Sequence, residues 1–290
     1  MGCSGSTAGS SSGSQSMACP IFVILVTHDS APVLSQCLAA FDRQSRRPDR
    51  IVIVDSGSTD RTYLQSLAGR SDVTLVFRDN IGYARANNIG IRSLPPTAAA
   101  MVVFLNPDAF LFPDALAEAA LVLEQHTDVA VVGGRLYGYD PVAGTATGRL
   151  DSTGIFRRWY GRWYDRGQGE RDSGQYGLAE SVSAICGALM ACRLEALPAP
   201  TTGQVFDEDF FLYKEDIELS LRLRHNGWIL RYEPKVRAYH CRGWGGNRRE
   251  VPAALRLAAA RSEVLLYRKH PSPYMLWAVA KYLLVRWCRC

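Results

Sequence analysis

An acidic segment, residues 206–216, places carboxylates among aromatic residues directly before a predicted helix. It ends in Glu215 and Asp216, where the helical pattern of residues 216–224 begins. A helix dipole stabilises carboxylates at its N-terminus, which is one explanation of the pair. The other is chemical, because the aromatic residues draw the segment toward the core and burial raises a carboxylate pKa toward that of a general base. We therefore treat the pair as a candidate for proton abstraction from a hydroxyl.

A second acid, Asp108, follows the apolar run 101–105, and Pro107 stiffens its approach. A carboxylate at the end of a buried strand suits Mg²⁺ or Mn²⁺, which is held by one or two protein ligands together with substrate phosphates. His240, after a predicted strand, supplies an imidazole nitrogen for the same ion. The alternatives are an N-cap or turn role for Asp108 before a helix near Pro113, and a structural role for His240.

Two further motifs fit the binding of a nucleotide. Asp55 ends the apolar run 50–54, where its carboxylate can accept hydrogen bonds from a base or ribose; alternatively it caps the turn 56–59. Residues 80–90 place small side chains at the entry of a predicted helix, which allows backbone to approach a nucleotide closely.

The elements that carry these motifs alternate between strand and helix. We expect strands at 21–26, 50–54, 73–78, 101–105 and 129–132, and helices at 31–44, 83–93 and 115–125. This order predicts an α/β fold with a doubly wound, mainly parallel sheet. Ligands bind beyond the carboxyl ends of such strands, so the polar clusters 27–29, 55–60 and 106–108 should share one site.

The second half is expected to be mixed. Residues 137–176 have little periodicity, and a segment of that length without regular structure is usually functional or mobile. Residues 183–193 look buried, strands are expected at 228–232 and 236–239, and a helix at 252–269. We divide the chain into a disordered Gly/Ser-rich tail or cloning tag (1–19), a main domain (20–270, with halves 20–133 and 134–250) and an amphipathic segment (271–290).

Composition narrows the choice of function. The formal charge of +5 is mild and its arginines are scattered, which disfavours a nucleic-acid partner. Scattered cysteines and no secretory apolar region favour a cytoplasmic protein. The first strand is followed neither by G-x-G-x-x-G nor by a Gly-rich basic loop, which disfavours a dinucleotide oxidoreductase and a nucleotidyltransferase. Residues 274–287 are too few to span a bilayer; they lie in its interface or pack back on the domain.

Taken in order, the motifs resemble family 2 glycosyltransferases of the GT-A fold, especially the bacterial rhamnosyltransferase-like branch. The resemblance covers roughly residues 20–270. It is carried by the following motifs: Val26-Thr27, Ile53–Asp60, Asn80–Gly90, Leu105–Asp108, Gly187-Ala188, Phe206–Phe211, Tyr213–Asp216 and His240.

The resemblance implies a role for each of these sites. Asp216 would be the base, with Glu215 orienting donor or acceptor, and one direct displacement would invert the anomeric carbon. Asp108 and His240 would bind the divalent cation. The implied nucleotide-sugar contacts are Thr27, Asp29, Asp55, Asn80, Gly82, Asn88, Asn106, Asp108 and Gly187.

Donor and acceptor follow from the same resemblance. It favours dTDP-L-rhamnose, with UDP-sugars as the alternative donors and a non-catalytic nucleotide-sugar-binding protein as the alternative function. Asn106 replaces the first acid of the usual D-x-D, and His28-Asp29 replaces Tyr-Asn, which leaves the donor open. The alternation of aromatic and basic residues in 156–164 fits a glycan or lipid-linked glycan acceptor at the inner face of the cell membrane, or a solvated loop. The acceptor candidates are Asp209, Trp159, Trp163 and Trp244.

Overall fold

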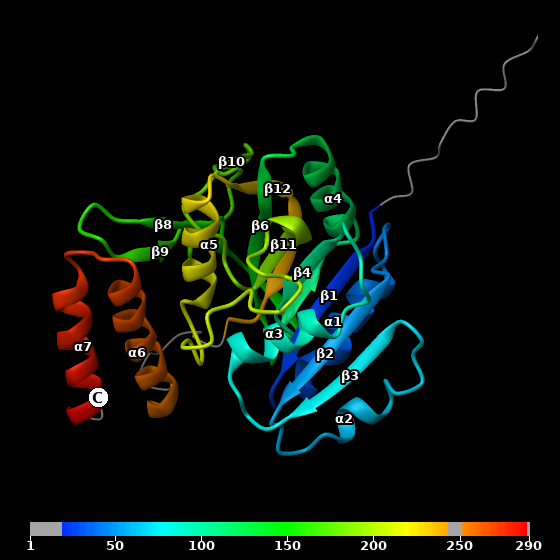
Figure 1. Ribbon diagram of the computed structural model, residues 1–290, viewed down its shortest axis with the longest axis horizontal. Coiled ribbons are helices and arrows are strands. Elements are labelled where there is room, and N and C mark those ends of the chain that lie inside the picture. Colours follow the sequence, from blue (N-terminus) through cyan, green and yellow to red (C-terminus); the bar gives the residue numbers. More distant parts are fainter. Residues whose placement is uncertain (1–18, 243–250, 289–290) are drawn as a thin grey trace, which may run out of the picture.

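The computed structural model describes residues 19–242 and 251–288 (Figure 1). The predicted disordered tail therefore lies outside the described residues except for Cys19, and the acceptor candidate Trp244 lies outside them as well. Within the described ranges, strands and helices alternate through the first half as the sequence predicts.

One large sheet forms the centre of the molecule. Its first four strands in sequence are parallel neighbours in the order β4, β1, β2, β3. Their bounds are β1 Ile21–Thr27, β2 Arg50–Ser56, β3 Val73–Arg78 and β4 Met101–Leu105. β1, β2 and β4 are nearly continuous runs of buried apolar residues, because helices cover both faces of this part of the sheet.

Register brings the predicted polar strand ends to one edge. Thr27 pairs with Asp55 across β1 and β2, and Leu25 pairs with Leu105 across β1 and β4. Asn106, the residue after Leu105, therefore lies close to Thr27 along the direction of the strands. The prediction that these strand ends share one edge is confirmed.

Helices pack on both faces of the sheet, and the alternation of side chains along β1 separates two cores. One core contains Leu25 with residues of α1 (Ala31–Asp42), α2 (Thr62–Gln65) and α4 (Ala115–Gln125). The other contains Ile24 with residues of α3 (Tyr83–Arg92), α5 (Glu215–His225) and α6 (Ala253–Lys269). The result is the doubly wound arrangement that the sequence predicts.

The second half extends the same sheet with mixed directions, in the order β4, β11, β6, β12, β10. β12 and β6 are parallel, whereas β11 runs antiparallel to both β4 and β6. The bounds are β5 Ala109–Leu111, β6 Val129–Asp140, β7 Thr145–Ser152, β8 Ile155–Arg157, β9 Trp163–Asp165, β10 Glu180–Ser181, β11 Leu189–Arg193 and β12 Ile229–His240, with a short 3₁₀ helix at Leu194–Ala196.

Two predictions for this half are wrong. Much of 137–176, expected to lack regular structure, forms β7, the end of β6 and the β8–β9 hairpin. β7 is mostly polar and exposed over its first five residues, and β8 and β9 have three residues each, so none of them carries an apolar alternation that periodicity could detect. The two strands expected at 228–239 are one strand, β12, in which a register shift between Glu233 and Arg237 accommodates Pro234.

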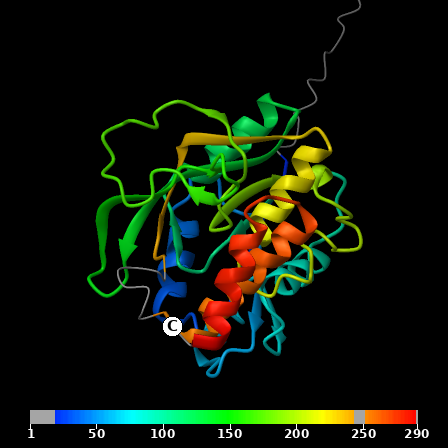
Figure 2. The ribbon, with the colours of Figure 1, turned by 90° about the vertical axis from the view of Figure 1, so that its left-hand side faces the viewer.

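The C-terminal helices stand side by side at one edge of the molecule (Figure 2). α6 packs against the second core through Leu266, and α7 (Met275–Cys288) packs on α6. Within the described residues, no helix is both long enough and apolar enough to cross a membrane.

Candidate active site

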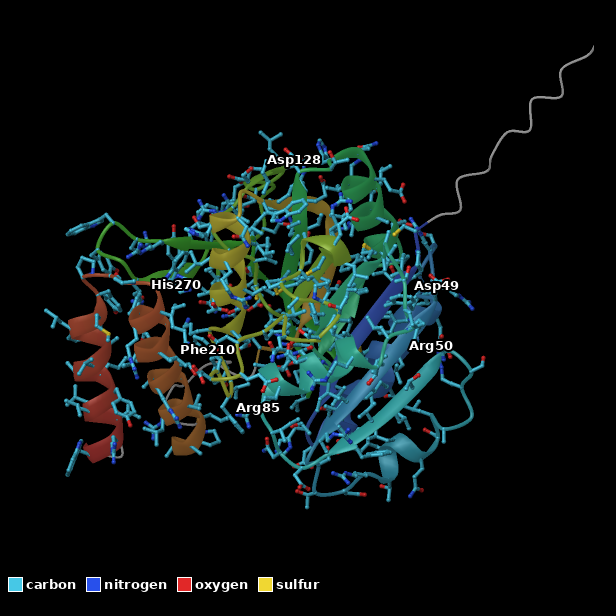
Figure 3. All side chains as sticks on the ribbon, in the orientation of Figure 1. Asp49, Arg50, Arg85, Asp128, Phe210 and His270 are labelled. Carbon is cyan, nitrogen blue, oxygen red and sulfur yellow. The ribbon has the colours of Figure 1, made fainter. Side chains whose placement is uncertain are left out.

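The acidic segment is clamped to α3 by one side chain. The amide of Asn88 donates to the carbonyl of Phe206 (2.8 Å) and accepts from the N–H of the same residue (2.8 Å). Asn88 is fully buried. In this structure its amide is engaged by the acidic segment, and its role as a nucleotide contact stays a prediction. Nearby, Arg85 of α3 lies 3.5 Å from a carboxylate oxygen of Glu208. Figure 3 labels Arg85 on α3 and Phe210 on the acidic segment.

α6 holds the other side of the segment. Ser262 donates a 2.7 Å hydrogen bond to the carbonyl of Leu212, and Lys269 pairs with Asp207 (2.6 Å) and Asp209 (2.8 Å). The predicted acceptor residue Asp209 is thus the exposed partner of a lysine on α6.

The segment ends in a backbone conformation that few residues adopt. Tyr213 (φ 69°) and Lys214 (φ 72°) are both left-handed, directly before α5 begins at Glu215. Such a conformation costs of order 1–3 kcal/mol per non-glycine residue and persists where surrounding contacts impose it. Here the bonds to Asn88, Ser262 and Lys269 fix the chain on the approach to Asp216.

Backbone amides orient Asp216. Its Oδ2 accepts from the N–H of Gly187 (2.9 Å), and its Oδ1 accepts from the N–H of Ile217 (2.8 Å). A Cβ on Gly187 would lie 3.1 Å from the Cβ of Asp216, so glycine permits the approach. Burial raises the pKa of Asp216 above its ordinary value, although Lys214 and both amides oppose the rise. A carboxylate of raised basicity suits proton abstraction.

Glu215 is more deeply buried than its neighbour, and its Oε2 has no hydrogen-bond partner in the described part of the chain. Burial, followed by the charge of Asp216, raises the pKa of Glu215 to about 8. An unpaired polar atom in such a place is costly in a resting protein. The group therefore has hydrogen-bonding capacity left for a ligand.

A second group of side chains gathers where β4 and β12 end. His240 Nε2 lies 3.5 Å from Oδ1 of Asp108, and His240 Nδ1 donates to Asp151 at 2.8 Å. Tyr83 links this group to the first, because its hydroxyl donates to Oδ1 of Asn106 (3.0 Å) and lies 3.4 Å from the carbonyl of Gly187.

The alternative role of Asp108 as a helix cap is excluded, since the N-cap position of α4 is occupied by Asp114. Burial lowers the pKa of His240, but the carboxylates of Asp108 and Asp151 outweigh it and raise that pKa to about 9. The carboxylate on Nδ1 fixes the ring so that Nε2 faces Asp108, which is the usual support of a metal-binding histidine.

Among residues 19–242 and 251–288, no cluster of three or more His, Cys, Asp or Glu side chains is arranged to hold a metal. Asp108 and His240 are thus a two-ligand set. Such a set fits Mg²⁺ or Mn²⁺ when diphosphate oxygens and water complete the coordination.

Asp55 lies at the same edge but is already fully engaged. It is buried and accepts from Arg61 Nε (2.7 Å), Thr27 Oγ1 (3.2 Å) and both the amide and hydroxyl of Ser58. Thr27 is fully buried too. The turn-capping alternative therefore describes the Asp55 carboxylate in this structure, with an ion pair to Arg61 added.

The remaining predicted donor contacts differ in exposure. Asp29 (φ 49°) accepts a 2.7 Å hydrogen bond from the N–H of Thr59, and Asn80 is exposed. Gly82 is buried, and a Cβ there would lie 2.6 Å from Phe211. Its small size thus permits the packing of the acidic segment on α3, and its contact with a nucleotide stays a prediction.

The aromatic candidates separate in the same way. Trp163 is only 8% exposed and belongs to the second core, so its ring packs inside the domain in this structure. Trp159 is 96% exposed at the tip of the β8–β9 hairpin. The alternation of residue types could not tell which tryptophan faces inward.

Some residues of this site were missed. Tyr83 was inside a recognised motif but had no assigned role, and Asp151 lies in the segment expected to be irregular. Arg242 joins Asp151 and Asp165, with 3.1 Å between its Nη1 and Asp165 Oδ2. These contacts are long-range, and nothing local in the sequence signals them.

Known proteins with similar sequences and structures can now be compared with this geometry. A curated N-acetylglucosaminyl-diphospho-decaprenol L-rhamnosyltransferase of Mycobacterium tuberculosis is 28% identical over 237 residues, 75% of either chain. The mannosyltransferase PcManGT of Pyrobaculum calidifontis, solved with GDP-Man and Mn²⁺, superimposes with a TM-score of 0.58 at 21% identity, covering 92% of this chain and 70% of that one. S. aureus TarS 1-349 with UDP-GlcNAc gives 0.55 at 14% identity, covering 93% and 73%.

The two solved structures establish the GT-A type of fold. The sequence profile described as Glycosyl transferase family 2 matches residues 22–193, more than half of the chain. The chain belongs to glycosyl transferase family 2.

Proposed function

We propose that this protein is an inverting, metal-dependent glycosyltransferase that moves L-rhamnose from dTDP-L-rhamnose to a hydroxyl of a lipid-linked glycan. One observation carries the proposal: Asp216 and the Asp108–His240 pair are joined through Gly187, Tyr83 and Asn106 in one hydrogen-bonded network. A group that removes a proton and a group suited to a diphosphate thus face the same site. The rhamnosyl donor and lipid-linked acceptor are suggested by the name of the Mycobacterium tuberculosis relative.

In the proposed reaction, Asp216 takes the proton of the acceptor hydroxyl as its oxygen attacks the anomeric carbon from the face opposite the diphosphate. One displacement inverts that carbon. The Gly187 and Ile217 amides keep the carboxylate pointed in one direction throughout. Glu215, with its unpaired Oε2, accepts a hydrogen bond from a sugar hydroxyl.

On the donor side, Asp108 and His240 would hold a divalent cation, which when bound neutralises charge on the departing diphosphate. Tyr83 fixes Asn106 beside this pair. Asp29 and Asn80 are the exposed members of the proposed nucleotide site. Its other proposed members at this edge are buried: Thr27, Asp55 and Gly82. A nucleobase could hydrogen-bond to Asp55 only if Arg61 or Ser58 released its own hydrogen bond to that carboxylate.

The acceptor is proposed to be reached at the cytoplasmic face of the membrane. A lipid-linked glycan stays in the bilayer, so the enzyme must approach it there. Trp159 and Asp209 remain the described candidates for acceptor contacts, and Trp244 is a candidate outside the described residues.

The test is direct transfer with purified protein. dTDP-L-rhamnose, UDP-GlcNAc and GDP-mannose are each offered with Mn²⁺ and a short-chain N-acetylglucosaminyl-diphospho-lipid, and the product is analysed by mass spectrometry and NMR. We expect transfer of a deoxyhexose from the dTDP donor with inverted anomeric configuration. A product of retained configuration would overturn the mechanism, and exclusive use of another donor would overturn the rhamnosyl assignment.

A further inference from the structure

The outward face of α7 is its apolar face. Leu276 is 83% exposed and Trp287 77%, and both lie on one stripe of the helix. The stripe consists of the exposed residues Leu276, Trp277, Ala280, Leu283, Leu284 and Trp287. Their spacing places them on one side of a helix. A helix that packs on a protein core normally shows the reverse orientation.

The opposite face of α7 fixes it to the domain. Ala278 is fully buried, and Lys281 forms a 2.6 Å ion pair with Glu263 of α6. The exposure of the apolar stripe therefore comes from specific contacts on the other side.

The tip of the β8–β9 hairpin continues the stripe. Tyr160 stacks against Tyr274, with ring centroids 5.8 Å apart, and Tyr267 donates a 3.0 Å hydrogen bond to the carbonyl of Gly161. An open groove of about 580 Å³ separates the tip from the start of α7. Hairpin and helix lie on the same edge of the molecule (Figures 1 and 2). We use the name aromatic surface for the following exposed residues of the hairpin tip and α7: Trp159, Tyr160, Leu276, Trp277, Leu283, Leu284 and Trp287.

The charges around the aromatic surface are of one sign. Arg158, Arg162 and Arg286 are exposed beside it. Residues 155–164 and 271–287 contain no Asp or Glu, and the nearby Glu263 is taken up by Lys281. The surface therefore combines exposed Trp and Tyr with positive charge.

We propose that the aromatic surface docks on an anionic phospholipid bilayer, with α7 lying in the interface. Tryptophan and tyrosine side chains favour the level of the headgroups, and arginine is attracted to anionic lipid. A second copy of this chain fits less well, because a two-fold interface would bring like charges together. α7 as described has 14 residues, a length that suits a helix lying in the interface and is shorter than the span of a bilayer.

The docking surface connects to the candidate active site through one helix. α7 packs on α6, and α6 holds the acidic segment through Ser262 and Lys269. Docking thus sets the position of Asp216 relative to the bilayer. That link to a lipid-linked acceptor rests on the proposed function, whereas the docking itself does not.

The experiment is co-sedimentation with vesicles of phosphatidylglycerol and phosphatidylcholine, and with vesicles of phosphatidylcholine alone. We expect wild-type protein to bind the anionic vesicles and to be released by added salt. The double variant Trp277→Glu/Leu284→Glu should bind roughly tenfold more weakly. The variants Leu178→Glu and Val142→Glu, which alter exposed apolar residues elsewhere, are the matched controls and should bind as wild type does. Arg158→Glu/Arg162→Glu should also weaken binding, and thermal melting verifies that each variant is folded.

Failure of wild-type protein to bind anionic vesicles would overturn the docking proposal. A dimer in analytical ultracentrifugation that Trp277→Glu/Leu284→Glu dissociates would also overturn it, since a second copy would then cover the surface. Transfer to a short-chain, water-soluble acceptor is measured in parallel and should be unchanged in the double variant. Vesicle binding without any sugar transfer by wild type would refute the proposed function and leave the docking supported.

Discussion

The backbone N–H of Gly187 donates a 2.9 Å hydrogen bond to Oδ2 of Asp216, while the N–H of Ile217 occupies Oδ1. The carboxylate is therefore oriented by main chain from two different segments. Main-chain donors hold such a group without the entropy that a long side chain would lose. The direction of the proposed base is set before any substrate arrives.

Replacing Asp216→Asn should remove the base and keep the volume of the side chain, although the NH2 group cannot accept from one of the two backbone amides. We expect transfer to fall by about 10²–10⁴-fold, because general base catalysis contributes that much. Donor affinity, measured by calorimetry with the nucleotide sugar and Mn²⁺, should stay near the wild-type value. Transfer at the wild-type rate would assign the base to another residue.

Gly187→Ala tests the orientation of that carboxylate. The added methyl group would lie 3.1 Å from the Asp216 Cβ, so the carboxylate must shift by a few tenths of an ångström. We expect kcat to fall roughly tenfold or more, since small misplacements of a catalytic group are costly. Gly69→Ala is the matched control, because a Cβ there meets nothing within 4 Å. Equal kcat values for the two variants would contradict the assigned role of Gly187.

Glu215→Gln should stabilise the fold in a pH-dependent way. The Glu215 pKa is raised from 4.5 to about 8, so the folded state keeps a proton that the unfolded chain releases. Stability from this group is full below pH 4.5 and is lost as the pH rises toward 8. Glutamine cannot ionise, so the Tm of the variant minus that of wild type should grow across this window. A difference that stays constant with pH would show that Glu215 titrates normally.

Asp151→Asn should weaken metal binding without removing a ligand. Asp151 fixes the His240 ring through Nδ1, and loss of such support costs about 10–100-fold in metal affinity. Mn²⁺ titration of the dTDP complex, followed by electron paramagnetic resonance, measures this directly. Asp114→Asn, at an exposed cap position, should leave Mn²⁺ affinity unchanged. Tight Mn²⁺ binding by both variants would separate Asp151 from the metal site.

Asn88→Ala should cost stability, because Phe206 would lose the partners of both its N–H and its carbonyl. Each buried group left unsatisfied costs about 1–3 kcal/mol. Urea denaturation should therefore show a lower midpoint than that of the wild-type protein. A midpoint equal to that of wild type would mean that water replaces the amide.

The sequence predicted the parallel half of the sheet almost to the residue. β3 and β4 have their expected bounds, and for β4 the reason is that a buried strand is a continuous apolar run between polar turns. It also predicted that Asp108, Asp216 and His240 lie near the ends of regular elements, and they do: after β4, at the start of α5 and at the end of β12. The long-range pairs could not be predicted. Asp151 meets His240 across 89 positions of sequence, and Asn88 meets Phe206 across 118.

Residue type alone also could not distinguish a residue that contacts a ligand from one that packs the surrounding segment. Asn88 and Gly82 belong to the same motif, and polarity or small size suggested a ligand for each. In this structure Asn88 bonds to Phe206 of the acidic segment, and Gly82 leaves room for Phe211 of the same segment. Both residues therefore help the segment to pack on α3. Trp159 and Trp163 are four residues apart, but the first lies at the exposed tip of the hairpin and the second is buried at the start of β9.

The grip of α6 on the acidic segment has a consequence for where the enzyme can be cut. The family profile ends at residue 193, before Asp216, and α6 begins only at Ala253. A fragment trimmed to residues 22–193 would retain the strand end at Asp108 and lack Asp216, the proposed base. One that stops after β12 would carry Asp216 without the Ser262 and Lys269 anchors. A fragment that keeps the proposed base and its anchors therefore extends beyond residue 193 and includes α6, the helix on which α7 packs.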